Sequence, residues 1–163
     1  MLEIRSATLE DLEEITKIYN EAILKSVATF DTEIKTIGEQ KKWFKNHGKK
    51  NPILVLILKR NIIGFASLSK YSTRCAYSDT AELSLYIKEK YQGKGYGKKL
   101  MESIIREGKK VSLHVILSRI TEGNEKSVHL HECFDFEYVG KMKEVGFKFG
   151  KLLDVYLMQR IYK

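Results

Sequence analysis

The chain has 163 residues, of which 43% are hydrophobic and 31% are charged. This composition is typical of a soluble globular protein, and the length fits one domain over residues 1–163. The longest apolar run, Ile53 to Leu58, is too short to cross a bilayer. Glu3 and Arg5 interrupt the N-terminus at once, so we expect no cleavable signal and a cytoplasmic protein. Two cysteines make no disulfide framework.

The formal net charge of +8 favours anionic partners, which include nucleic acid, a membrane surface and a polyanionic cofactor. The lysines are scattered as pairs, such as residues 41–42, 49–50 and 109–110, and do not form one basic helix. Neither a zinc finger nor an aromatic RNA-binding strand occurs. We therefore expect most of this charge to be solvated surface, with no nucleic-acid or membrane partner.

The first half of the chain predicts two helices between strands. A short strand at 2–5 precedes a helix opened by Thr8, and after a loop at 29–33 Thr36 caps a second helix that stops near Gly48. Residues 52–59 and 61–70 then read as a hairpin, with Arg60 and Asn61 at its turn, and an aperiodic loop covers 69–79.

The second half predicts four strands and two helices. The predicted elements are a strand at 81–87, a helix from Leu100 that Gly108 stops, a strand at 112–120, a helix at 124–134 begun by Asn124 as a cap, and closing strands at 136–142 and 154–160, joined by a loop that holds Gly146, Lys148, Phe149 and Gly150. The order β-α-α-β-β-β-α-β-α-β-β indicates an α/β fold, with a mixed sheet covered by helices.

The segment from Thr80 to Lys109 organises the chain. Its strand is followed by the turn Gln92-Gly93-Lys94-Gly95-Tyr96-Gly97-Lys98, and then by a helix. Alternate glycines before a helix let backbone N–H groups converge on an anion, which the positive helix end also favours. The spacing fits neither the dinucleotide fingerprint nor the P-loop. The turn is therefore predicted to bind a phosphate or pyrophosphate of another kind.

The form Gln92-x-x-Gly95-x-Gly97 after a strand resembles the acetyl-CoA loop of the GCN5-related N-acetyltransferases (GNAT). The whole chain is similar to the phosphinothricin and methionine-sulfoximine acetyltransferase family within that superfamily. The resemblance implies the GNAT fold, with a mostly antiparallel mixed sheet flanked by helices, acetyl-CoA as co-substrate, a small-molecule amine acceptor and a homodimer. The matching segments are Ile18-Tyr19-Asn20, Phe30-Asp31-Thr32-Glu33, Arg74-x-Ala76-Tyr77, Ala81 to Ile87, Asn124-x-x-Ser127, Leu130-His131-Glu132 and Lys148-Phe149-Gly150-x-x-Leu153-Asp154-Val155.

Glu82 is the predicted catalytic base. It lies on the polar side of a largely buried strand, where an unpaired carboxylate is costly, so we expect its pKa to be raised. Such a glutamate could take a proton from a substrate ammonium, directly or through water. The family resemblance gives this glutamate the same role. The alternative is a structural carboxylate, paired with a lysine or capping backbone amides.

His131 is the second catalytic candidate. It follows Asn124 by two helical turns, so the two side chains share a face. Imidazole could do acid or base work, and the alternative is a histidine that only hydrogen-bonds the cofactor. His129, His131 and Cys133 are close together, but His131 points away from the other two on a helix and no second ligand pair occurs, so no metal is expected.

The cofactor contacts are predicted at the strand end and the turn. The backbone of Leu85, Tyr86 and Ile87 can pair with the pantetheine arm as an added strand does, and the amides of residues 93–98 can hold the pyrophosphate. The resemblance adds the Asn124 side chain near the arm, and Cys133 is expected to pack beside it.

The acceptor is expected among Phe30, the segment Arg74-Cys75-Ala76-Tyr77 and Lys148. Arg74 or Lys148 could hold a carboxylate or phosphinate; alternatively, both are solvated charges, and Phe30 and Tyr77 are core residues. Three residues depart from the family pattern and put the acceptor in doubt: Cys75 for a common proline, Leu152 for a usual tryptophan and Asp135 for a usual glycine. Aspartate tolerates left-handed backbone better than most residues.

The sequence predicts an acetyl-CoA-dependent N-acetyltransferase of the α-amine of a small amino-acid-like acid, of the phosphinothricin, methionine sulfoximine or methionine sulfone type. One alternative is acetylation of a protein N-terminus or lysine, which requires an open groove near loops 29–33 and 147–152. Another is a non-catalytic acyl-CoA sensor, which would be expected to lack Glu82. A nucleic-acid binder is the third, and its affinity would fall steeply with salt.

Overall fold

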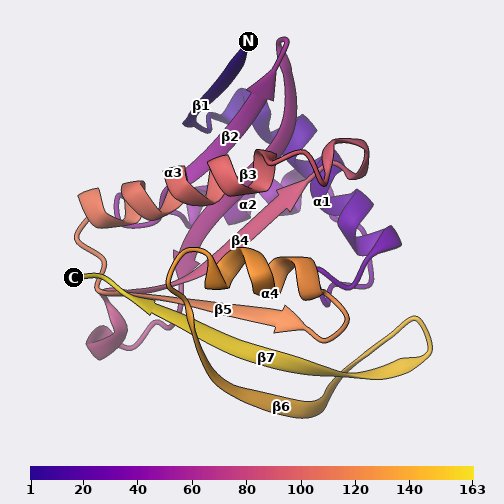
Figure 1. Cartoon of the computed structure of the whole chain (residues 1–163). Helices are drawn as coiled ribbons and strands as arrows, with labels where there is room; N and C mark the ends of the chain where they lie inside the picture. Colours follow the sequence, from indigo (N-terminus) through magenta and orange to yellow (C-terminus); the bar gives the residue numbers. More distant parts are fainter.

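A computed structural model describes residues 1–163, and its strands and helices follow the predicted order (Figure 1). Three single turns of 3₁₀ helix are added at Leu9–Asp11, Cys75–Tyr77 and Glu89–Tyr91. The elements are β1 (Leu2–Ser6), α1 (Leu12–Lys25), α2 (Ile37–Lys45), β2 (Ile53–Leu58), β3 (Asn61–Lys70), β4 (Thr80–Ile87), α3 (Tyr96–Lys110), β5 (Val115–Thr121), α4 (Glu125–Glu132), β6 (Glu137–Lys148) and β7 (Lys151–Ile161).

The seven strands form one sheet in the order β1-β2-β3-β4-β5-β7-β6. Every neighbouring pair is antiparallel except β4 and β5, which run parallel. The parallel pair is short, since only Thr80, Ala81 and Glu82 of β4 are in register with β5. Beyond Glu82 the two strands diverge, as Figure 1 shows. This divergence interrupts the sheet in its middle.

Helices cover both faces of the sheet. The amphipathic helix α3 buries Leu100, Met101 and Ile104 against one face, where α4 also lies, in front of the sheet in Figure 1. On the other face, α1 contributes a smaller core, in which Leu12, Ile15 and Ile18 pack with Val55 and Phe65. The two cores pack against the central strands from opposite faces of the sheet.

Helix α3 differs from the sequence prediction at both ends. It begins at Tyr96 and not at Leu100, because Gly95 occupies the N-cap position with a left-handed backbone. Gly108 does not stop the helix, which continues to Lys110. A Cβ atom at Gly108 would lie 2.2 Å from the Tyr162 hydroxyl oxygen, so this glycine permits close packing of the C-terminal segment.

The predicted loop between the two closing strands is wrong. Residues 143–148 extend β6, and Gly146 and Lys148 therefore lie in a strand. Only Phe149 and Gly150 remain as the turn, both with positive φ, the backbone of a two-residue hairpin turn. The β2–β3 turn is also displaced by one residue, to Lys59 and Arg60, which both have positive φ. Positive φ at a non-glycine residue is uncommon, so sequence preference gives no signal for Lys59, Arg60 or Phe149.

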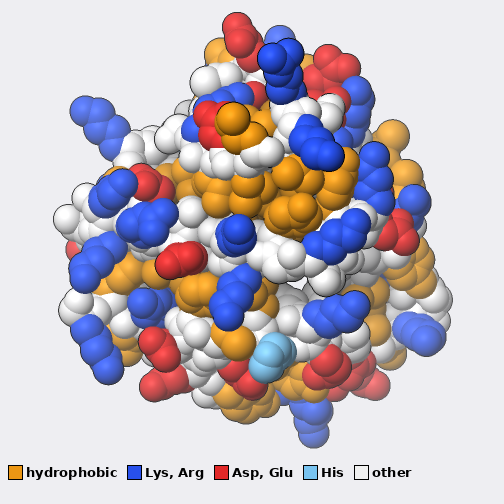
Figure 2. All heavy atoms as spheres, turned by 45° about the horizontal axis from the view of Figure 1, so that its top comes forward, with side chains coloured by type: hydrophobic (Ala, Val, Ile, Leu, Met, Phe, Trp, Pro, Cys, Tyr) orange, Lys and Arg blue, Asp and Glu red, His pale blue; other side chains and the backbone are white.

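The remaining boundaries differ less: α2 ends at Lys45 before Gly48, β5 starts at Val115, and α4 is shorter than predicted. No helix is both long and apolar enough to cross a membrane. Figure 2 shows lysine and arginine side chains dispersed over the visible face, as their pairwise spacing in the sequence predicts.

Candidate active site

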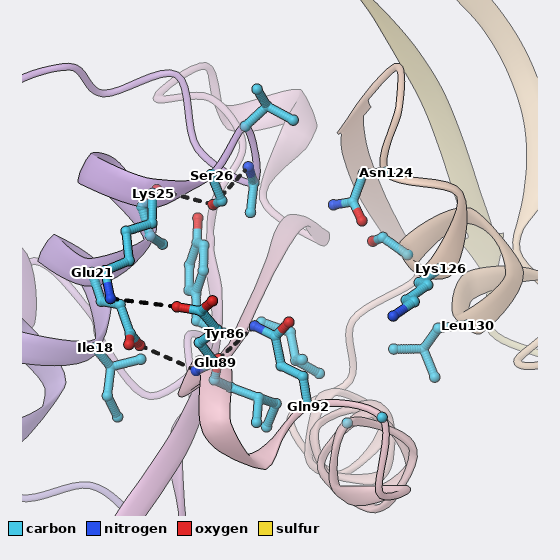
Figure 3. Close-up of a pocket in the computed structure, with 18 of the residues that line it drawn as sticks. Ile18, Glu21, Lys25, Ser26, Tyr86, Glu89, Gln92, Asn124, Lys126 and Leu130 are labelled. Atoms are coloured by element: carbon cyan, nitrogen blue, oxygen red, sulfur yellow. Dashed lines mark hydrogen bonds and ion pairs between the residues drawn. The ribbon is translucent and has the colours of Figure 1, made fainter. Parts of the chain in front are cut away.

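A cavity of about 600 Å³ opens where β4 and β5 diverge. Three walls enclose it: the end of α1 with residues 26–28, the end of β4 with the glycine turn, and the start of α4. In Figure 3, Lys25 lies on one side of Tyr86, and Asn124, Lys126 and Leu130 lie on the other. We call this cavity the cofactor cleft.

The end of β4 presents unpaired backbone groups to the cofactor cleft. The N–H of Lys88 donates to the carbonyl of Ile63 on the β3 side. Because backbone groups alternate along a strand, those of Leu85 and Ile87 face the opposite side, where β5 has already diverged. The Gln92 side chain donates to the Ile87 carbonyl at 2.9 Å and so fastens the turn to the strand. The backbone of Leu85 and the N–H of Ile87 thus form an open edge for an extended, amide-bearing ligand.

The glycine turn delivers a second set of free N–H groups. Gly93 and Gly95 have φ of 74° and 85°, which only glycine adopts readily. The backbone of Lys99 is the first to donate within this helix, to Gly95. The preceding N–H groups, of residues 96–98, therefore have no helical acceptor, and Gly97 among them lines the wall of the cleft. This geometry suits a pyrophosphate.

The side chain of Asn124 is available to a ligand. Asn124 occupies the N-cap position of α4 as predicted, but its side chain makes no capping hydrogen bond. It lines the cofactor cleft, opposite Tyr86 in Figure 3. Burial raises the pKa of Tyr86 to about 12, so its hydroxyl is protonated near neutral pH.

Glu82 is not an unpaired carboxylate. Both its oxygens accept from the Arg119 guanidinium on β5, Oε2 from Nε at 2.5 Å and Oε1 from Nη2 at 2.7 Å. The Glu82 side chain is 23% exposed and the Arg119 side chain 59%. The hydrogen bonds to Glu82 raise the pKa of Arg119. The prediction that Glu82 is unpaired is therefore wrong, because Arg119 on the neighbouring parallel strand β5 balances the charge of its carboxylate.

A second cavity, of about 450 Å³, surrounds this ion pair, and we call it the Glu82 cavity. Arg74 and Tyr77 line it, as do Tyr71 and Ser72. The exposed Tyr77 ring packs edge-on against Tyr71 at 5.1 Å between centroids, so Tyr77 is not a core residue. Cys75 and Ala76 form the short helical turn between the two predicted ligands and do not line the cavity.

Phe30 and Lys148 lie together, away from the Glu82 cavity. The Lys148 ammonium is buried and donates to the backbone carbonyls of Ser26 at 2.8 Å and Thr29 at 2.7 Å. Burial lowers the pKa of Lys148. The Phe30 ring covers Gly146, where a Cβ atom would lie only 2.1 Å from the ring. Lys148 is therefore not a solvated charge, and it fastens the β6–β7 hairpin to the loop after α1.

His131 and Cys133 do not line the cofactor cleft. His131 is buried; its Nδ1–H donates to the Ser127 carbonyl at 2.6 Å, and its Nε2 accepts from the Ser118 hydroxyl at 2.8 Å. Burial lowers the pKa of His131, which keeps the ring neutral with both nitrogens occupied. Cys133 is exposed and its sulfur lies 3.7 Å from the ring of His129.

Two of the unusual positions have a clear structural setting. Asp135 has φ of 62°, the left-handed backbone that aspartate tolerates. Leu152 is exposed on β7, so a larger aromatic there would be on the surface. No group of three or more His, Cys, Asp or Glu side chains is arranged to hold a metal ion.

Residues 4–157 match the family model for the acetyltransferase (GNAT) domain. The L-methionine sulfoximine/L-methionine sulfone acetyltransferase of Pseudomonas aeruginosa is 33% identical, with 96% of this chain and 92% of the relative covered. The phosphinothricin N-acetyltransferase of Streptomyces coelicolor is 32% identical, with 98% and 95% covered. The crystal structure of a GNAT phosphinothricin acetyltransferase from Sinorhizobium meliloti with acetyl-CoA superposes with a TM-score of 0.94 at 33% identity, covering 98% of this chain and 88% of that one.

The chain belongs to the GNAT acetyltransferase family. It is an N-acetyltransferase with acetyl-CoA as its acetyl donor. The cofactor cleft fits this molecule, because it combines an open strand edge for the pantetheine amides with free helix N-terminal amides for the phosphates.

Some residues of this GNAT site were missed by sequence reasoning. Arg119 lies 37 positions from Glu82, and its place depends on the register of β4 and β5, which no local pattern encodes. The loop at 26–28 and Lys126 line the cofactor cleft without belonging to any recognisable motif. Only the alternation in β5, which puts Leu117 and Arg119 on one side, could have suggested a polar residue beside Glu82.

Proposed function

We propose that this enzyme acetylates the α-amine of a small amino-acid-like acid. Relatives of this chain are named for phosphinothricin, for methionine sulfoximine and methionine sulfone, and, in Escherichia coli, for L-amino acids. The acceptor class of this chain is inferred from these names together with the charges of the Glu82 cavity.

The observation that carries the proposal is the position of Glu82 where β4 and β5 begin to diverge, beside Arg74 and Arg119 in one cavity. Acetyl-CoA supplies an acetyl thioester when it is bound in the cofactor cleft. The Glu82 cavity then holds the acceptor, with the Arg74 guanidinium for a carboxylate or phosphinate. Two oppositely charged anchors match the two charges of an amino acid.

Glu82 remains able to accept a proton although it is paired with Arg119. Each carboxylate oxygen has two lone pairs, and Arg119 occupies one on each oxygen. The free lone pairs can receive a hydrogen bond from the acceptor ammonium and then its proton, which leaves the amine nucleophilic. Arg119 fixes the direction of the carboxylate while this happens, and a positioned base of this kind contributes about 10² to 10⁴ in rate.

The test is thiol release from acetyl-CoA with phosphinothricin, methionine sulfoximine, methionine sulfone, a lysine-containing peptide and a free peptide N-terminus. Turnover is expected with the amino acids, and Glu82→Gln should reduce kcat/KM about 100-fold or more. Glu102→Gln, an exposed position of α3, is the matched control and should retain full activity. Turnover with the peptides alone would show that the acceptor is a peptide amine and not an amino acid. Full activity of Glu82→Gln would show that Glu82 is not the catalytic base.

We also propose that two copies associate through the edge of the sheet formed by β6 and β7. Several large apolar side chains are exposed along this hairpin, a hazard for an isolated edge strand that a second copy would relieve. Light scattering should give the mass of two chains, and the mass of one chain would contradict the proposal. The exposed residues are Tyr138, Val139, Met142, Val145, Phe147 and Leu152.

A further inference from the structure

A third cavity, of about 520 Å³, lies between α1, α2 and the central strands. It is separate from the cofactor cleft and from the Glu82 cavity, and none of the predicted site residues except Tyr86 lines it. Its floor is formed by Gln40 of α2, Ser67 of β3 and Ser84 of β4. We call it the Gln40 cavity.

The floor of the Gln40 cavity carries polar groups without partners in the protein. Gln40 is 6% exposed and Ser67 is 1% exposed, yet the side chain of neither forms a hydrogen bond within the chain. The sole side-chain polar atom that is sealed from solvent and unpaired is Nε of Arg160. The amide of Gln40 and the hydroxyl of Ser67 therefore open on the cavity. Buried polar groups normally have a partner, so these two are suited to a ligand.

The Gln40 cavity is a neighbour of both reaction cavities. Tyr86 lines it and also lines the cofactor cleft. Glu82, Ser84 and Tyr86 alternate along the same side of β4, and residues two apart in a strand are separated by about 6.6 Å. An amino acid whose amine reaches Glu82 can therefore extend its side chain over Ser84 toward Gln40.

The charges at the rim of the Gln40 cavity limit which chemical groups can bind there. Asp31 is paired with Lys35 at 3.7 Å, and the Glu39 carboxylate accepts from the backbone N–H of Thr36 at 2.7 Å. Lys35 offsets the charge of Asp31, and the ammonium of Lys42 in the same lining offsets the charge that Glu39 keeps, so the lining as a whole is neutral. An amide, hydroxyls and an ammonium favour a group that is rich in hydrogen-bond-accepting oxygens.

We propose that the Gln40 cavity is the specificity pocket of the acceptor, and that Gln40 and Ser67 bind the oxygen-bearing end of its side chain. The inference rests on the proposed function, because it takes the amine of the same acceptor to be at Glu82. Sulfone, sulfoximine and phosphinate groups are the chemical class that the pocket suits.

Methionine sulfone and methionine form a matched pair of acceptors, since they differ only in the two oxygens on sulfur. We compare kcat/KM for the two with wild type, Gln40→Leu and Ser67→Ala, and measure the Kd of methionine sulfone by calorimetry. Each variant should reduce kcat/KM for the sulfone about fivefold to tenfold, with a similar loss in Kd, and should leave methionine within about twofold. Methionine turnover also shows that each variant is folded.

The control is Ser103→Ala, a buried serine of α3 that lines none of the three cavities. It should leave both acceptors unchanged. Equal losses for methionine and the sulfone in Gln40→Leu and Ser67→Ala, or no loss for either, would overturn the specificity pocket while the proposed function stands. No turnover of either amino acid by wild type would overturn the proposed function, and the inference with it.

Discussion

The cofactor cleft and the Glu82 cavity are both lined by residues of β4 but are built from different parts of the chain. The cleft is formed mainly by backbone: the open edge of β4 and the N-terminal amides of α3, which are adjacent in sequence. The Glu82 cavity is formed by side chains from distant segments, such as Arg74, Glu82 and Arg119. A site made of backbone groups keeps its binding groups when side chains around it are substituted. A site made of side chains changes its binding groups with each substitution.

This difference explains how one fold can keep acetyl-CoA and change its acceptor. The amides of the glycine turn need small residues at few positions, and Gly93 and Gly95 satisfy that need through positive φ. The proposed acceptor site depends on side chains such as Gln40, Ser67 and Arg74, which do not line the cleft, so we expect substitutions there to leave the cleft unchanged. Variants that affect both sites, and variants that affect only one of them, test this comparison.

Lys148→Met should disturb both sides, because Lys148 holds the loop that follows α1. Two hydrogen bonds from a buried ammonium are lost and two carbonyls lose their donor, so stability should fall by about 2 kcal/mol. Ser26, Val27 and Ala28 of this loop line the cofactor cleft, so KM for acetyl-CoA should rise roughly threefold to tenfold. Thermal unfolding and steady-state kinetics measure the two effects.

Lys151→Met, at an exposed position of the same hairpin, is the matched control. It should change neither the melting temperature nor KM. If Lys148→Met behaved like this control, the hairpin would not position the loop.

His131→Gln should give a smaller, pH-dependent effect. Burial lowers the pKa of His131 below its ordinary value of 6.5, so on acidification the unfolded chain takes up a proton that the folded chain does not. The unfolded state then binds more protons, and stability falls as the pH drops below about 6.5. Between pH 7.5 and 5.5 the wild type should lose roughly 2 °C more in melting temperature than the variant.

His129→Gln removes an exposed histidine of the same helix and should follow the wild-type pH dependence. The same variant pair also tests His131 as an acid or base. Because both ring nitrogens are occupied by Ser118 and Ser127, we expect kcat at pH 7.5 to change little in His131→Gln. A loss near 100-fold would assign His131 to the chemistry.

The fold and the cofactor cleft could be predicted because their signals are local. The alternation of residues 81–87, the glycine turn and the apolar stripe of α3 are contiguous, and Leu85, Ile87 and Gly97 from these segments line the cleft. The family resemblance added Asn124, which the structure also places there. Errors at helix ends came from Gly95 and Gly108, where a glycine can start, stop or pack a helix.

The acceptor side could not be predicted to the same extent, because its contacts join distant residues. Lys148 reaches Ser26 across 122 positions, and Arg119 reaches Glu82 across 37. In both cases the sequence leaves open a free charge, at Lys148 and at Glu82, and the structure gives that charge a hydrogen-bonding partner. The sequence predicts one acceptor site for Phe30, Lys148 and Arg74, whereas the long β6–β7 hairpin carries Lys148 to the loop after α1.

Calorimetric titration with acetyl-CoA tests most directly whether the two sides are separate. Gly97→Leu places a side chain against Leu130 at the cleft wall and should weaken the Kd about tenfold or more. Gly140→Leu, where a Cβ atom has nothing within 4 Å, should leave it unchanged. In Glu82→Gln the Kd should stay within about twofold of wild type although turnover is lost. A loss of affinity in Glu82→Gln as large as that in Gly97→Leu would contradict the separation of a backbone-built cofactor cleft from a side-chain-built acceptor site.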